Sequence, residues 1–191
     1  MMSSMRGVVR QILVLWSVVG LLASTADVHG QEGRKRERDR AAPPAKLQPP
    51  DKRDTVVAIP GNAFNGRAYW QALAQCGGIY FKLGTLYSDV AIRARVVTPD
   101  KNADTLNTKL SGDARKMAAA FFVAAERFLT TDRSVTTEEA IVTYDGRASE
   151  AGDRLKKIDD AVEASKPCPA LYQACHGANT KACSDTAPLT N

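Results

Sequence analysis

Hydrophobic residues recur at helical spacing in three long segments of the chain. They run from Tyr69 to Val97, from Asp100 to Phe128 and from Thr136 to Lys166, with apolar positions mostly three and four residues apart. Thr136 and Glu139 have the spacing of a capping box. Prolines follow the first and third segments, and the residue before a proline avoids helical geometry. The pattern predicts three long helices, with Ile141 and Val162 on the apolar face of the third.

Short loops separate these segments, so consecutive helices are expected to lie antiparallel. The prediction is an all-α fold, an up-down-up bundle of three long antiparallel helices over residues 61–176. A short C-terminal helix or strap, tied by disulfides, is expected to close the bundle. Residues 177–191 show no apolar periodicity and are expected to form an irregular tail.

The first 60 residues differ from the rest in composition. Residues 1–30 have basic, apolar and small-residue portions in the order of a secretory signal peptide, with cleavage after Ala26 or Gly30. The apolar run of residues 12–23 is shorter than the roughly 20 residues that cross a bilayer, although an uncleaved anchor is the alternative. Residues 31–60 are predicted to form a disordered basic and proline-rich arm. The mature protein is therefore expected in the periplasm or outside the cell, with no transmembrane span.

The net charge of +5 is not spread evenly along the chain. Residues 1–53 hold ten basic and five acidic residues, and residues 54–191 hold 16 of each. A nucleic-acid-binding fold normally carries its basic patch on the folded surface, so no nucleic-acid partner is expected. The basic arm acts either as a solvated spacer or through loose contact with anionic envelope polymers or lipid headgroups.

Four cysteines in an exported chain predict two disulfides. Cys168 follows the third helix, so it is expected where the first helix ends. If the first helix is continuous, that end lies about 30 Å along the bundle from Cys76 at 1.5 Å per residue. A disulfide tolerates Cα atoms only about 4.4–6.8 Å apart. The predicted pairs are therefore Cys76 with Cys183 and Cys168 with Cys175. A sharp break at Gly77–Gly78 would instead allow Cys76 to pair with Cys175.

The sequence offers little for catalysis. It lacks the nucleophile-elbow, zinc-protease, Walker and dinucleotide-binding motifs. No enzyme activity and no cofactor are expected. The alternative is a binder of a small ligand, haem or metal, in the bundle interior or at the cluster of Cys168, Cys175, His176 and Cys183. That cluster lacks the C-x-x-C-H spacing of haem attachment, because Tyr172 stands at the first cysteine position.

Apolar residues outside the main stripe of the first segment indicate a second hydrophobic face. A face that the bundle leaves uncovered would bind a partner or a second copy of the chain. The sequence therefore predicts an exported, non-enzymatic helical module that binds a protein or cell-envelope partner. The predicted partner surface consists of Trp70, Ile79, Phe81 and Leu86.

Overall fold

The computed structural model describes residues 49–177 and residue 183. Five helices follow one another in this part of the chain, and it holds no β-strand beyond one isolated bridge between Val56 and Ala68. The predicted signal peptide, residues 31–48 of the arm and the tail except Gly177 and Cys183 lie outside the described residues. The helices are α2 (Tyr69–Val96), α3 (Lys101–Arg133), α4 (Thr137–Asp153), α5 (Ile158–Ser165) and α6 (Cys168–Gly177).

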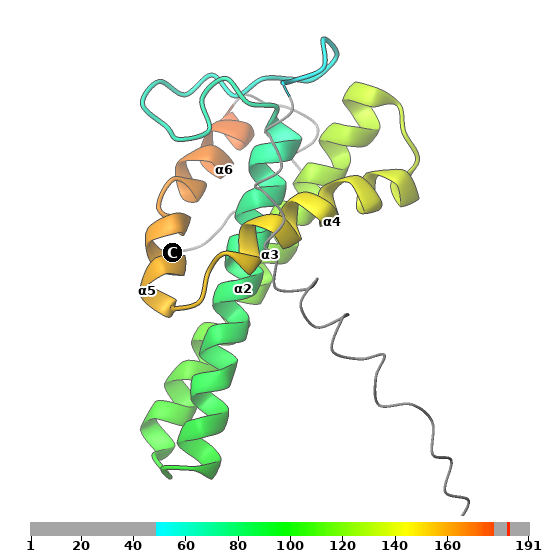
Figure 1. Ribbon diagram of the computed structural model, residues 1–191. Coiled ribbons are helices and arrows are strands. Elements are labelled where there is room, and N and C mark those ends of the chain that lie inside the picture. The colour runs from blue at the N-terminus through cyan, green and yellow to red at the C-terminus, as the bar shows by residue number, and fades with distance from the viewer. Residues whose placement is uncertain (1–48, 178–182, 184–191) are drawn as a thin grey trace, which may run out of the picture. The chain divides into compact units, whose positions relative to one another are not determined.

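Helices α2 and α3 form the predicted antiparallel hairpin (Figure 1). The Asp100 carboxylate caps α3 by accepting hydrogen bonds from the backbone N–H groups of Asn102 and Ala103. Helix α3 continues to Arg133, through residues expected to form a loop, and ends at Ser134 in the left-handed conformation. Small side chains such as Ala91 and Ala114 are buried between the two helices, so the backbones approach closely.

The third predicted helix is divided in the structure. Its capping box is present, because Thr136 and Glu139 bond each other's backbone N–H groups. Helix α4 then ends at Asp153, next to Gly152, and residues 154–157 turn the chain before α5 begins. The expectation of three long helices is therefore wrong for the third.

The break redirects the C-terminal part of the fold. In Figure 1, α4 crosses the α2–α3 hairpin, and α5 and α6 run back beside the N-terminal half of α2. Ile141 and Val162, predicted on the core face of one helix, are 42% and 39% exposed. Their positions no longer share a face, because a turn separates the two helices that carry them.

The disulfides correct the predicted pairing. Cys76 is bonded to Cys168, with Cα atoms 5.7 Å apart, and Cys175 is bonded to Cys183. The exclusion of Cys76–Cys168 depended on a continuous first helix, and α2 is continuous. It was wrong because it placed Cys168 at the far end of α2, where an unbroken third helix would have carried it. Because the chain reverses after α4, Cys168 instead reaches the level of Cys76.

The core is concentrated around the N-terminal half of α2. There, Leu73, Phe121, Leu171 and Tyr172 are almost fully buried. The Phe121 ring packs between Tyr80, which it stacks on, and Tyr172, which meets it edge-on. Three helices and the N-terminal segment thus meet at one end of the hairpin.

The ordered fold begins earlier than the predicted boundary at residue 61. Val57 is 1% exposed, and backbone hydrogen bonds join it to Arg67 and Gly66. Gly66 has a φ of 78°, which lets the chain turn back toward α2. Residues 54–60, predicted as part of the arm, therefore belong to the folded unit.

Candidate functional site

The structure distributes the four residues of the predicted partner surface over different environments. Trp70 and Ile79 are buried in the main core, at 3% and 7% exposure. Leu86 is half-buried and packs against a small cluster formed by Leu83, Ala114 and Ala161. Only Phe81 is largely exposed, at 56%. Three of the four apolar side chains are therefore covered by the fold itself.

Phe81 lies at the edge of a groove between α2, α3 and α4. The groove has a volume of about 320 Å³. Its floor is formed where α4 crosses α2, and its walls carry both aromatic and charged side chains. Those wall residues include Phe81, Lys82, Phe122, Asp145, Ser149 and Asp153.

The close crossing of two backbones builds this groove. A Cβ atom added to Gly78 would lie 2.0 Å from the Ala148 carbonyl oxygen, so only glycine fits at this position. Gly152 lies one turn further along α4, where an added Cβ would be 3.1 Å from the Gly78 carbonyl oxygen. Because neither glycine has a side chain, α4 packs directly on α2, and Phe81 is left beside the crossing rather than beneath it.

Phe122 forms another wall of the groove. Its ring occupies the space that a side chain at Gly77 would need, with ring carbons 2.3–3.1 Å from the added Cβ. The same ring stacks on Tyr144 of α4 at a centroid distance of 5.4 Å. Burial raises the pKa of the Tyr144 hydroxyl, and the negative charges of Glu126 and Asp145 raise it further. Phe122 is thus held in place from both sides.

The charges of the groove come from Lys82 on α2 and from Asp145 and Asp153 on α4. Within the described part of the chain, none of the three forms an ion pair or a side-chain hydrogen bond. The groove contains no histidine or cysteine among its lining residues.

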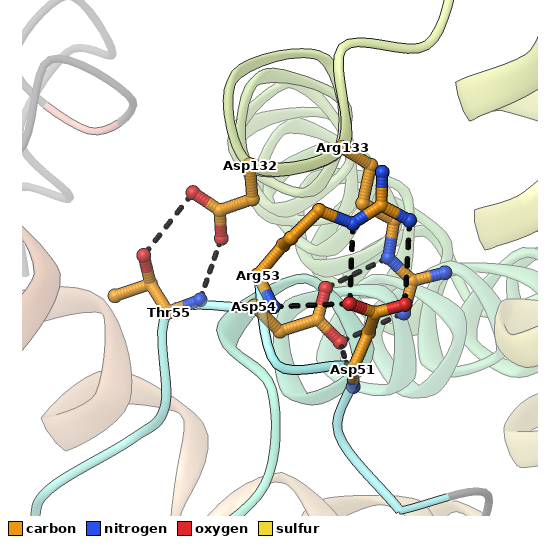
Figure 2. A network of polar contacts seen from close by, with 6 residues as sticks. All are labelled: Asp51, Arg53, Asp54, Thr55, Asp132 and Arg133. Atoms are coloured by element: carbon orange, nitrogen blue, oxygen red, sulfur yellow. Dashed lines mark hydrogen bonds and ion pairs between the residues drawn. The ribbon is translucent and has the colours of Figure 1, made fainter.

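A second polar cluster joins the N-terminal segment to the end of α3 (Figure 2). The Asp54 carboxylate is fully buried and accepts two hydrogen bonds of 2.7 Å from the Arg133 guanidinium. Beside this pair, the Asp51 carboxylate accepts from the backbone and guanidinium of Arg53. The Asp132 carboxylate accepts from the backbone N–H and hydroxyl of Thr55, at 2.7 and 3.1 Å.

The electrostatics of this cluster match a structural role. Burial raises the pKa of Asp54, but its hydrogen bonds with Arg133 and Asp51 and the Arg133 charge outweigh burial and lower it overall. Hydrogen bonds from the Arg53 side chain and backbone lower the pKa of Asp51 to about 2. The Arg133 guanidinium also lies 5.0 Å from the centre of the Trp70 ring. We call the cluster of Asp51, Arg53, Asp54, Thr55, Asp132 and Arg133 the N-terminal clasp, because it joins the N-terminal segment to the end of α3.

Sequence reasoning missed the N-terminal clasp. Asp51, Arg53 and Asp54 lie in a charged, proline-rich stretch, whose composition is that of a solvated segment. The partner of Asp54 is 79 positions away along the chain. No local pattern links the two residues, so only the fold brings them together.

The cluster of cysteines and His176 does not offer thiolate ligands to a metal. Cys168, Cys175 and Cys183 are all engaged in disulfides, and metal ligation requires the thiolate. In the part of the chain that the structure describes, no group of three or more His, Cys, Asp and Glu residues is arranged to hold a metal ion. His176 instead packs edge-on against Tyr172, with centroids 4.5 Å apart. The cysteines of this segment are structural.

Searches with protein-family models, with curated proteins and with solved structures found no match to this chain. Across residues 49–177, no helix has both the length and the apolar character needed to cross a membrane.

Proposed function

We propose that this protein is an exported, non-enzymatic helical module that binds a protein or cell-envelope partner through the groove beside Phe81. The observation that carries the proposal is the exposure of Phe81, at 56%, beside a groove of about 320 Å³. A large aromatic side chain at the edge of a groove is typical of the anchors that dominate protein interfaces. The neighbouring charged residues would set the orientation of the partner.

Export is supported by two independent features. The signal-like pattern of residues 1–30 precedes the fold, and the four cysteines form two disulfides, which persist in oxidising compartments. The intact mass of the protein recovered from outside the cytoplasm tests this part of the proposal. We expect a chain that begins at Asp27 or Gln31, and an unprocessed chain retained in the cytoplasm would contradict export.

Site-specific photo-crosslinking in the producing cell tests the binding site. A photoreactive residue at position 81 is expected to yield a discrete crosslinked product. The matched control is position 106, because Leu106 on α3 is 57% exposed but does not line the groove. Equal crosslinking at both positions, or none at position 81, would contradict a partner at the groove.

A further inference from the structure

We propose that the groove beside Phe81 binds an arginine side chain presented by the partner. This inference rests on the proposed function and specifies the chemistry of the partner at the same site. The guanidinium would lie against the Phe81 ring and pair with the carboxylate of Asp145 or with that of Asp153. It follows from the charge of the groove, from its aromatic wall and from a similar arrangement elsewhere in the molecule.

The charge of the groove favours a cation. Two carboxylates on α4 face one ammonium group on α2, so the lining carries a net charge of −1. Asp145 and Asp153 are exposed and lie eight residues apart on α4, about 12 Å along its axis, so a single guanidinium pairs with one of them at a time. Because neither carboxylate is engaged within the described residues, both are available to an incoming cation.

The aromatic wall favours arginine among cations. A guanidinium is planar, stacks on aromatic faces and donates hydrogen bonds in two directions at once. Phe81 offers an exposed ring on α2, and the two carboxylates lie on α4 across the groove. A lysine ammonium would pair with a carboxylate, but it has no planar group to stack on the ring while it pairs.

The molecule already uses this combination in the N-terminal clasp. There, the Arg133 guanidinium donates two hydrogen bonds to the Asp54 carboxylate (Figure 2). The same guanidinium lies over the Trp70 ring, 5.0 Å from its centre. The groove contains the aromatic ring and the carboxylates of such an arrangement but not the arginine. The partner would supply that missing group.

Titration of the full-length, disulfide-bonded protein with short capped peptides tests the proposal. The probes are Ac-Gly-Xaa-Gly-NH2 peptides in which Xaa is arginine, lysine or citrulline, and NMR follows the amide signals of Phe81, Ser149 and Asp153. Citrulline has nearly the shape of arginine but no charge. We expect saturable shifts with the arginine peptide and at least tenfold weaker binding of the citrulline peptide, whereas equal binding of these two peptides would overturn the proposal. Equal binding of the lysine peptide would overturn the preference for arginine.

Variants that change the charge of the groove should change the affinity for the arginine peptide in opposite directions. Replacing both groove carboxylates (Asp145→Asn with Asp153→Asn) should weaken binding of the arginine peptide about fivefold, since exposed ion pairs are individually weak. The matched control carries the same change of charge on α5 (Asp159→Asn with Asp160→Asn) and should leave binding unchanged. Lys82→Gln should tighten binding about threefold, because it removes a competing cation. Weaker binding by Lys82→Gln, or equal losses in the two double variants, would overturn the proposal.

The two proposals fail in different ways. If crosslinking at position 81 succeeds but the peptides show no preference for arginine, the groove binds a partner of other chemistry. If the peptides bind as expected but no product forms at position 81 in cells, the groove recognises arginine but no partner occupies it there. A discrete product together with the arginine preference supports both proposals.

Discussion

The two ends of the α2–α3 hairpin are stabilised in different ways. At the end that holds Tyr69 and Arg133, the hairpin is surrounded by α4, α6 and the N-terminal segment, and both disulfides and the clasp lie there. The opposite end, near Val96 and Lys101, extends past α4 and α5 (Figure 1). We call these the stapled end and the free end.

The packing chemistry of the two ends follows from this difference. The stapled end buries large side chains, such as Phe121 and Tyr172, which contribute the most to stability when they leave water. The free end is held by small side chains, by one buried hydrogen bond from the Ser111 hydroxyl to the Gly84 carbonyl and by surface contacts. Its large apolar residues stay exposed, including Val96 and Val97 at 71% each. Most of the stability of the fold therefore resides in the stapled end.

The largest expected effect comes from the disulfide that joins α2 to α6. Removing it with Cys76→Ala and Cys168→Ala should lower the free energy of unfolding by about 4–5 kcal/mol, because it closes a loop of 92 residues. The second double variant, Cys175→Ala with Cys183→Ala, removes a disulfide that closes a loop of only 8 residues. It should lower the free energy of unfolding by about 2–3 kcal/mol. Urea denaturation of the two double variants measures both losses. A larger loss from the second pair would contradict this ranking.

A substitution at the crossing of α4 over α2 should destabilise the fold nearly as much. Gly78→Ala places a Cβ atom against the Ala148 backbone and should destabilise the fold by about 3 kcal/mol. Gly146→Ala is the matched control, because nothing lies within 4 Å of its added Cβ and alanine favours helix. Thermal unfolding should show a large loss for the first variant and a small gain for the second. Similar behaviour of the two would mean that α4 does not pack on α2 at Gly78.

The N-terminal clasp should respond both to substitution and to pH. Asp54→Asn breaks the ion pair between the buried Asp54 carboxylate and Arg133, whose side chain is 23% exposed. We expect the free energy of unfolding near pH 7 to fall by about 2–3 kcal/mol. Because the pKa of Asp54 is lower in the folded state, its contribution is present above pH 4 and is lost as the pH falls through that lowered value. Asp51, with a pKa of about 2, responds in the same direction.

Unfolding curves recorded from pH 7 to pH 2 check the clasp. The wild-type protein should lose stability below about pH 4, where unfolded carboxylates bind protons. The Asp54→Asn variant should lose less stability over the same pH range, because it lacks one of the carboxylates whose protonation destabilises the fold. Identical pH profiles would exclude Asp54 as a source of the acid sensitivity.

The smallest effect is expected at the free end. Arg95 and Asp104 form an exposed ion pair of 2.8 Å between α2 and α3, and Arg95→Gln should leave the unfolding midpoint unchanged. Hydrogen exchange should be faster for amides near Val90 than for those near Leu73, since few large buried contacts protect the free end. Equal protection along α2 would contradict the contrast between the two ends.

Sequence patterns predicted much of the local structure. The spacing of apolar residues indicated the α2–α3 hairpin, and the pair of Thr136 and Glu139 marked the start of α4. These features depend on residues close together in the chain, whose preferences act locally. The candidate site was identified less well. Phe81 is exposed as expected, but the heptad spacing could not show that Trp70 and Ile79 are covered.

By itself, the sequence determined the helical class, the hairpin and the presence of cysteines able to form two disulfides. Only the tertiary structure decided the course of the chain after Gly152 and the pairing of Cys76 with Cys168. It also decided the joining of Asp54 to Arg133 and the groove beside Phe81. The physical reason is that helix propensity and capping act over a few residues. The end of α4 at Asp153, in contrast, changes the direction of the chain that follows, and the contacts that result depend on packing between distant parts of the chain.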